Sequence, residues 1–373
     1  MKSIFLSLLA PFSVIFIALA MHFGIGAVDN GYYTNQLTQV GIAIVLAVSL
    51  NIVNGFSGQF SLGHAGFAAI GGYVAGALLL YGSIRLFGER LPGGVLSFTR
   101  PLEYFQGSIF GWGDLYFPAV IICAGLLAAG VGWVVGLPSL RLRGDYFAIV
   151  TVGFGEIVRV LLQSSNTQVS IPQIPTVDPT RLATSLGGAL GFNYIPKYAS
   201  LFWVFLSVGV VCVAAYRLKY SRFGRAYLAI REDEIAAAAM GVSTIRCKVQ
   251  ACMIAAFFAG VAGALLASSQ GTINAGDLAF IRSLEIVIMV VLGGLGSISG
   301  AVIAATVLTV LPEVLQAEVV QRYRLILYAL ILIVVMILRP RGLFGLREIW
   351  DLFPKRITTL GVNVVPPRKE DRN

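Results

Sequence analysis

The chain has 373 residues, of which 57% are hydrophobic and only 12% are charged. Soluble domains carry roughly 25% charged residues, so this composition excludes an ordinary water-soluble domain and indicates an integral membrane protein. The net charge of +9 is explained by basic residues that orient the loops, without any need for nucleic-acid binding.

Apolar runs of about 20 residues predict membrane-spanning helices along the whole chain. The first run follows Met1 and Lys2 and resembles a signal peptide, but no small-residue cleavage site precedes the polar Asp29 and Asn30. A retained first helix is therefore expected. The predicted fold class is all-α, a polytopic transmembrane helical bundle with broken or re-entrant helices, with spans at 4–21, 38–54, 60–82, 117–136, 145–163, 201–216, 249–269 and 323–338.

Glycine-rich segments at 54–66 and 293–300 interrupt two apolar stretches. The second divides 284–311 into arms too short to span a membrane, which predicts two short helices that meet at a turn. Paired breaks of this kind are typical of transport pathways. The alternatives to a pathway role are that the glycines serve only helix packing and that His64 makes only a packing hydrogen bond. The candidate pathway residues are Gly58, Gln59, Ser61, His64, Gly293, Gly294 and Gly296.

The two breaks, one in each half of the chain, are also compatible with an internal duplication, although residue similarity between the halves is thin. Between the breaks, Glu156 and Arg159 stand three residues apart within a predicted span. Because an unpaired charge in a bilayer is costly, we expect them to form an i,i+3 ion pair. This pair could tether helices or line a path.

The loop 217–248 contains seven basic residues, which predicts a cytoplasmic location. Threading outward from it places both termini in the cytoplasm. Within the loop, 231–241 predicts a short helix with acidic residues at its start, ended by a glycine. We interpret this helix as a docking site for a partner, with a solvated connector as the alternative. The candidate docking residues are Arg231, Glu232, Asp233, Glu234, Ala238 and Gly241.

The chain lacks the motifs of common catalytic sites: it has no phosphate-binding loop, nucleophile elbow or His-Glu-x-x-His pair. It has only two histidines and no zinc-like cysteine spacing, so no metal site is expected. The chain is therefore not expected to be an enzyme. Any use of ATP would come through a partner bound at the docking helix.

Eight short sequence blocks, in their order along the chain, resemble those of the LivM-type permease subunits of branched-chain amino acid ABC importers. The resemblance covers roughly 300 residues. Each block is weak alone, but together and in this order they are specific. They lie at 50–55, 58–67, 143–151, 155–159, 224–226, 230–241, 290–297 and 339–343.

The resemblance implies a bacterial inner-membrane importer that moves branched-chain or other hydrophobic amino acids inward by alternating access. It implies a second, related permease subunit, two cytoplasmic ABC ATPases and a periplasmic substrate-binding protein as partners. ATP and Mg²⁺ would be used by the ATPases, with no cofactor on this chain. The permease domain is expected over 1–353, with the coupling loop at 217–248 and a polar, disordered cytoplasmic tail over 354–373.

The chain departs from the family pattern mainly on the outer side, at 163–173 and in a long loop at 81–117. Related permeases import urea or short amides, which leaves the cargo open. Two alternatives from other classes remain at this stage. One is an ion-coupled secondary transporter with Glu156 as the coupling acid, and the other is a membrane scaffold.

Overall fold

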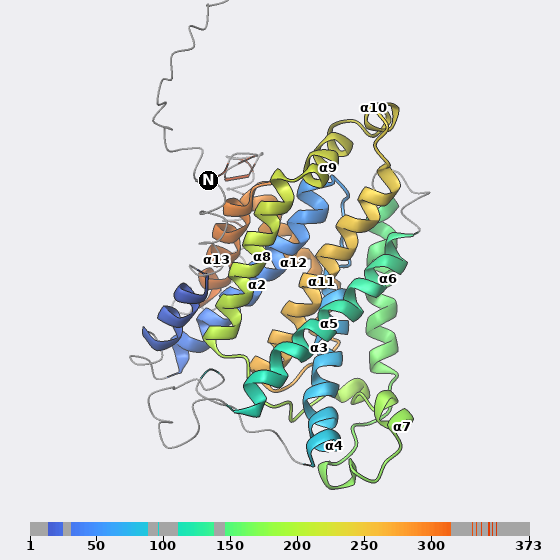
Figure 1. Ribbon diagram of the computed structural model, residues 1–373, viewed down its shortest axis with the longest axis vertical. Helices are drawn as coiled ribbons and strands as arrows, with labels where there is room; N and C mark the ends of the chain where they lie inside the picture. Colours follow the sequence, from blue (N-terminus) through green and yellow to red (C-terminus); the bar gives the residue numbers. More distant parts are fainter. Residues whose placement is uncertain are drawn as a thin grey trace, which may run out of the picture.

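The computed structural model describes residues 14–24, 31–88, 96, 111–137, 146–314 and the single positions 330, 333, 337, 342, 343, 345 and 348. Within these residues the fold is a bundle of helices (Figure 1). An apolar helix is described over Val14–Gly24. The labelled helices are α2 (Tyr32–Asn51), α3 (His64–Ala77), α4 (Ser83–Phe87), α5 (Trp112–Gly136), α6 (Tyr146–Gln163), α7 (Pro179–Thr184), α8 (Leu201–Tyr220), α9 (Arg222–Glu232), α10 (Glu234–Ala239), α11 (Thr244–Gln270), α12 (Phe280–Gly293) and α13 (Ile298–Val314).

Six helical segments in the described part of the chain are long and apolar enough to cross a membrane. They are Tyr32–Phe56, His64–Phe87, Trp112–Gly136, Tyr146–Gln163, Leu201–Tyr220 and Thr244–Gln270. Each overlaps a span predicted from the sequence, and the predicted class of polytopic helical membrane protein is confirmed. The last predicted span, 323–338, lies almost entirely outside the described residues, as does the tail at 354–373.

Two of these segments change helix type along their length. α2 continues as a π-helix over Ile52–Phe56, and α3 continues through a π-helix over Leu78–Gly82 into α4. A π-turn widens the helix by one residue and is frequent at functional sites. The first one runs into the glycine-rich break at 54–66, and from Ser57 onward the chain leaves the helix altogether.

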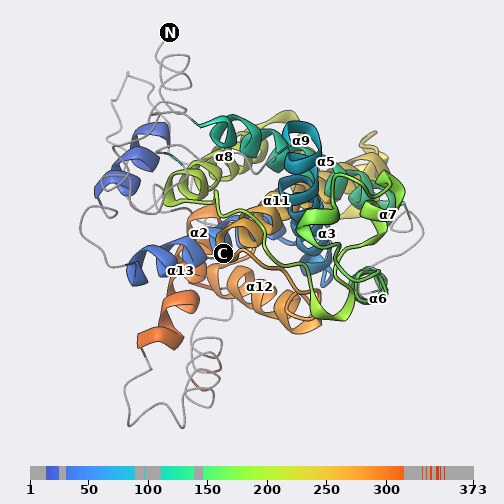
Figure 2. The same ribbon diagram turned by 90° about the horizontal axis from the view of Figure 1, so that it is seen from below.

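Helix α11 lies at the centre of the bundle and packs against α2, α3 and α5 (Figure 2). In its apolar 18-residue stretch 83% of the residues are buried, against 22% in that of α6 at the periphery. Small residues permit this close packing: a Cβ on Gly71 of α3 would lie 2.2 Å from the carbonyl oxygen of Gly260. Close backbone approach of this kind is the usual way membrane helices associate, because lipid supplies no hydrophobic drive between them.

Helices α12 and α13 are the two short arms expected around the second glycine-rich segment. They contain 14 and 17 residues and pack against each other and against α2. At 1.5 Å per residue α12 is about 21 Å long, shorter than the roughly 30 Å hydrocarbon core, and the described part of α13 is about 26 Å long. The turn between them lies at the same end of the bundle as α9 and α10, because Lys219 and Arg231 both contact it.

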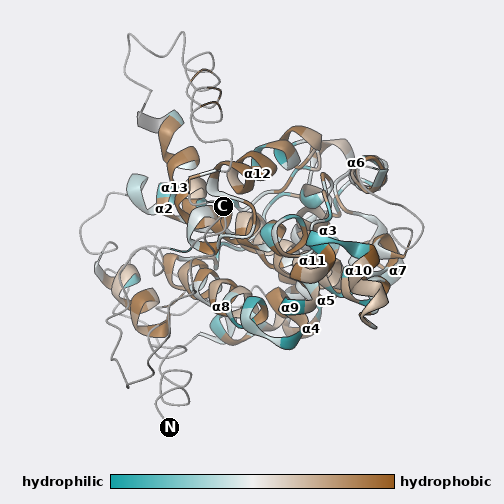
Figure 3. Ribbon diagram, turned by 90° about the horizontal axis from the view of Figure 1, so that it is seen from above, coloured by the Kyte–Doolittle hydropathy of each residue, from teal (hydrophilic) through white to brown (hydrophobic). Residues whose placement is uncertain are grey.

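We call this end the α9–α10 end; α4 and α7 lie at the opposite end (Figure 1). Seen from the α9–α10 end, the hydrophilic stretches gather near α9 and α10, whereas the long helices are mainly hydrophobic (Figure 3). At the opposite end, residues 164–200 form short helical turns, and one antiparallel bridge joins Phe192 to Ile273.

Candidate functional site

At the first break, glycines allow the chain to leave the helix, and the side chain of Asn54 bonds to the backbone of the segment that follows. Asn54 accepts a hydrogen bond from the Ser61 backbone N–H (3.1 Å) and donates one to the Ser61 carbonyl oxygen (3.4 Å). Gly58 has a φ of 70°, and a Cβ there would lie 2.9 Å from Cγ of Arg231. A side chain at Gly58 would therefore both strain the backbone and displace Arg231.

The second break is a tight turn between α12 and α13. Gly294 and Gly296 have φ values of 108° and 90°, which favour glycine. Gly293 lies at the last position of α12, where a Cβ would come within 2.4 Å of the Gly300 carbonyl oxygen. The glycines at these positions therefore serve a backbone turn and a close helix contact.

Asn51 joins the two breaks directly. Its side-chain oxygen accepts a hydrogen bond from the Gly296 N–H, and its amide nitrogen donates one to the Ser297 carbonyl oxygen, both at 2.9 Å. The Asn51 side chain is fully buried. Because a buried polar group needs its partners, this pairing ties the end of α2 to the α12–α13 turn.

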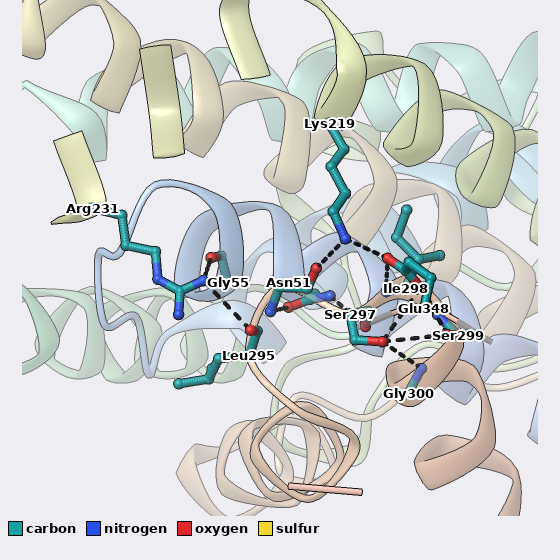
Figure 4. A network of polar contacts seen from close by, with 11 residues as sticks. Asn51, Gly55, Lys219, Arg231, Leu295, Ser297, Ile298, Ser299, Gly300 and Glu348 are labelled. Carbon is teal, nitrogen blue, oxygen red and sulfur yellow. Dashed lines mark hydrogen bonds and ion pairs between the residues drawn. The ribbon is translucent and has the colours of Figure 1, made fainter. Parts of the chain in front are cut away.

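Arg231, near the end of α9, reaches the same place from the side (Figure 4). Its Nη1 donates a hydrogen bond to the Gly55 carbonyl oxygen at 2.6 Å and a longer one to the Leu295 carbonyl oxygen at 3.4 Å. One guanidinium group thus contacts both breaks. We refer to Asn51, Gly55, Arg231, Leu295 and Gly296 as the junction.

Arg231 was expected among the docking residues, and the structure directs its side chain into the bundle. A sequence signal for this orientation exists. Arg231 follows Tyr227 by four residues, so both share one face of α9, and Tyr227 is 1% exposed. The sequence predicted one short helix over 231–241 and not α9 as a separate helix, so this buried face of α9 was not predicted.

A fully buried carboxylate, that of Glu348, lies beside the junction and caps the start of α13. It accepts hydrogen bonds from the backbone N–H groups of Ile298 (3.1 Å) and Ser299 (3.0 Å) and from the Ser299 hydroxyl (2.7 Å). Lys219 forms an ion pair with it at 2.5 Å. A negative charge at a helix N-terminus is favoured by the unpaired N–H groups and the helix dipole.

The hydrogen bonds decide the charge state of Glu348. Burial alone would raise the pKa of its carboxyl group, but the hydrogen bonds from Lys219, Ser299 and Ile298 outweigh burial. The pKa of Glu348 therefore lies below its ordinary value of 4.5. Lys219 also donates to the Gly296 carbonyl oxygen at 2.8 Å, so this ion pair adjoins the junction (Figure 4). No sequence pattern pointed to Glu348 or Lys219.

The acidic run that precedes α10 is divided between two helices, rather than lying wholly in the first turn of one. Glu232 is the last residue of α9, and Asp233 is the N-cap of α10, where its Oδ1 accepts from the N–H groups of Ile235 (2.8 Å) and Ala236 (3.0 Å). Glu234 begins α10. The extended backbone of Asp233 ends α9 and begins α10 because its carboxylate satisfies the free N–H groups.

Helix α10 presents apolar side chains outward. Ile235 is 73% exposed and Met240 is 85% exposed, and Ala238 is exposed between them, whereas Ala237 is buried. Gly241 follows with a φ of 84°, as expected for a residue that ends a helix. An exposed apolar face on a short helix at the polar end of the bundle is typical of a protein-docking surface.

The remaining candidate pathway residues lie near the first break. His64 is buried at the start of α3, and its Nε2 lies 2.7 Å from the Ser49 hydroxyl oxygen, a contact that suits a packing role. Gln59 is also buried, and its side-chain oxygen has no hydrogen-bond partner among the described residues. Contact of Gln59, Ser61 or His64 with a transported molecule stays a prediction.

Glu156 and Arg159 form the expected ion pair, with Arg159 Nε 2.7 Å from Glu156 Oε2. Arg159 also donates to the Gln163 side-chain oxygen at 2.8 Å. The pair is partly exposed, and its hydrogen bonds to Glu156 and Gln163 lie within α6 and involve no junction residue. Among the described residues, no group of three or more His, Cys, Asp or Glu side chains could hold a metal ion.

The chain is similar to known membrane permeases. The family model described as branched-chain amino acid transport system / permease component matches residues 32–336. Over 320 residues the chain is 35% identical to the high-affinity branched-chain amino acid transport system permease protein LivM of Escherichia coli (strain K12), covering 81% of this chain and 67% of that protein.

The chain is also similar to a second type of permease from Escherichia coli (strain K12). Over 322 residues the chain is 24% identical to the high-affinity branched-chain amino acid transport system permease protein LivH of Escherichia coli (strain K12), covering 84% of this chain and 95% of that protein. The probable LivM of Methanocaldococcus jannaschii is 27% identical over 273 residues, which is 70% of this chain and 74% of that protein. No solved structure matches the chain.

Proposed function

The chain belongs to the branched-chain amino acid transport permease family, and on that premise we propose that it is the permease subunit of an ATP-binding-cassette importer. The cargo is a branched-chain or other hydrophobic amino acid, moved inward across the bacterial inner membrane by alternating access. The α9–α10 end and both termini face the cytoplasm. ATP hydrolysis occurs in separate ATPase subunits.

The observation that carries this proposal is the contact of Arg231 with both breaks. Arg231 lies two residues before Asp233, which caps α10, so a force applied to the exposed face of α10 acts on a helix bonded to Gly55 and Leu295. An ATPase bound at α10 would therefore displace α9, and α9 would displace both helix breaks together. Alternating access then becomes a population shift between two packings of the broken helices.

The proposed partners are those that the family resemblance implies. Two ABC ATPases bind at α10 and at the corresponding helix of a second, related permease, and a periplasmic binding protein delivers cargo at the opposite end. The similarity to both LivM and LivH, each named as a permease protein of branched-chain amino acid transport, supports the pairing of two related permeases.

Uptake in a strain that lacks this gene tests the proposal. Restoring the gene should restore uptake of radiolabelled leucine that stops when ATP is depleted with arsenate and continues with a protonophore. The reverse pattern would favour an ion-coupled transporter, as would loss of uptake in Glu156→Gln. Restored uptake of urea or acetamide without leucine would assign the short-amide cargo.

Replacing Glu232, Asp233 and Glu234 together with Ala tests the docking role in the same strain. Loss of the Asp233 cap alone costs about 1 kcal/mol of helix stability, so α10 should be less ordered. We expect normal membrane insertion, weaker co-purification of the ATPase subunits and loss of uptake. Unchanged uptake would contradict docking at α10.

A further inference from the structure

A cavity lined by both polar and apolar residues opens at the end of the bundle opposite α9 and α10. It has a volume of about 490 Å³ and lies between the start of α2, the end of α11 and the start of α12. A neighbouring cavity of about 420 Å³ shares two of its lining residues, Gln39 and Gln270. Each volume falls within the range of small-molecule sites. No residue of the junction lines either cavity.

Opposite charges stand side by side in the larger cavity. Arg282 and Glu285 lie in the first two turns of α12, with Arg282 Nη1 2.7 Å from Glu285 Oε2, and their side chains are 31% and 40% exposed. Asp277, just before α12, adds a second carboxylate to the lining. A guanidinium carries five N–H donors, and the ion pair uses the donors of one nitrogen, so Arg282 can bind a second carboxylate.

Apolar side chains complete the same cavity. Leu266 and Leu278 are buried in its wall, and Ile281 is 71% exposed on α12. The cavity therefore combines a cation, two carboxylates, two amides and an aliphatic surface. A hydrophobic α-amino acid has the complementary set: a carboxylate, an ammonium group and an aliphatic side chain. Urea and acetamide carry neither charge.

We propose that this cavity binds the transported hydrophobic amino acid as a zwitterion, after the binding protein releases it and before it passes through the permease. Arg282 binds the carboxylate, Glu285 binds the ammonium group with Asp277 nearby, and the aliphatic side chain lies against Leu266 and Ile281. This inference rests on the proposed function, since it assigns the place where that cargo first contacts this chain.

The position of the cavity connects it to the junction. Its wall includes Gln39 of α2 and Arg282 and Glu285 of α12, and these two helices end at the two breaks. A ligand bound between α2 and α12 at this end is therefore in contact with both helices that Arg231 and Asn51 connect at the other end.

Alkylation protection tests ligand binding without depending on transport. The probe is Gln270→Cys in the full importer complex in membranes, with the exposed native thiol removed by Cys123→Ser. At a Kd of about 1 mM, 10 mM leucine should slow alkylation about tenfold. Leucinamide, which lacks the carboxylate, and 4-methylpentanoate, which lacks the ammonium group, should protect far less. If Gln270→Cys does not assemble, Gln39→Cys serves as the reporter.

Charge variants test whether protection by leucine against alkylation depends on Arg282 and Glu285. Arg282→Gln and Glu285→Gln should each weaken leucine protection by about tenfold or more, since each removes a charge-assisted hydrogen bond. Arg181→Gln, the same change on α7 in a separate cavity, should leave protection unchanged and serves as the matched control. Arg282→Lys, which keeps the charge without the planar fork, should retain part of it.

The outcomes separate this inference from the proposed function. Leucine uptake by the wild type without any protection by leucine would overturn the binding site and leave the importer function standing. Protection by the binding protein alone, or equal protection by acetamide, would also overturn it, assigning the cavity to protein docking or to uncharged amides. Absence of leucine uptake in the wild type would instead contradict the proposed function.

Discussion

Arg231 and Gly55 are 176 positions apart in the chain, yet the Arg231 guanidinium donates a 2.6 Å hydrogen bond to the Gly55 carbonyl oxygen. Gly55 belongs to the π-helical end of α2, and Arg231 belongs to the short helix α9 that precedes the exposed α10. The contact therefore joins the surface where a partner could bind to a helix break inside the bundle.

Replacing Arg231 with Ala should uncouple transport from ATP hydrolysis. The Gly55 carbonyl oxygen loses a charge-assisted bond worth roughly 1.5–3 kcal/mol, so movement of α9 is no longer passed to the breaks. Leucine uptake should fall about tenfold or more, while the ATPase subunits still co-purify. Arg225→Ala, an exposed arginine on the same helix, is the matched control. Equal losses in both variants would contradict a specific role for Arg231.

Replacing Asn51 with Ala should destabilise the protein itself. The change removes the Asn51 partner of the buried Gly296 N–H, while the Ser297 carbonyl oxygen keeps its hydrogen bond from the Ala301 N–H, at a cost of about 1–3 kcal/mol. The melting temperature of the purified protein should fall by several degrees. Asn35→Ala, at an exposed position at the other end of α2, should have little effect. A melting temperature unchanged in Asn51→Ala would show that the pairing contributes nothing to stability.

Acid should remove the stabilisation that Glu348 supplies. Because the pKa of Glu348 in the folded protein is lowered from 4.5, its contribution is complete above that value and declines as the pH falls through the lower folded pKa. Glu348→Gln leaves Lys219 without its carboxylate partner and should cost about 3 kcal/mol at neutral pH.

Melting temperatures measured at neutral pH and below pH 4.5 test whether the stability contributed by Glu348 falls as the pH falls. The wild type should lose stability on acidification, and the difference between the wild type and Glu348→Gln should shrink. A difference that stays constant, or grows, as the pH falls would contradict a charged Glu348 at the start of α13.

Charges on the exposed face of α10 should abolish docking without harming the fold. Ile235→Asp and Met240→Asp replace side chains that are 73% and 85% exposed, so stability should change by no more than about 0.5 kcal/mol. The ATPase subunits should no longer co-purify, and leucine uptake should be lost. Met240→Leu keeps an apolar side chain and should retain both. Full co-purification in the Asp variants would place the docking surface elsewhere.

Local patterns in the sequence were sufficient for the architecture. Apolar runs of membrane length gave the described spans, and the glycines at 54–66 and 293–300 located both helix breaks, since each signal depends only on residues close together in the chain. The ion pair of Glu156 with Arg159 was predictable for the same reason, because residues three apart share a helix face. The division of the acidic run by the Asp233 cap was not foreseen.

The contacts that make the site are long-range. Asn51 meets Gly296 across 245 positions, and Glu348 meets Ser299 across 49, and neither pairing follows from hydropathy or helical period. Composition and periodicity specify which segments enter the membrane, because burial of apolar surface acts on each segment separately. Which polar groups meet inside the bundle depends on how the segments pack, since every buried donor and acceptor must find its partner among groups that packing alone brings together.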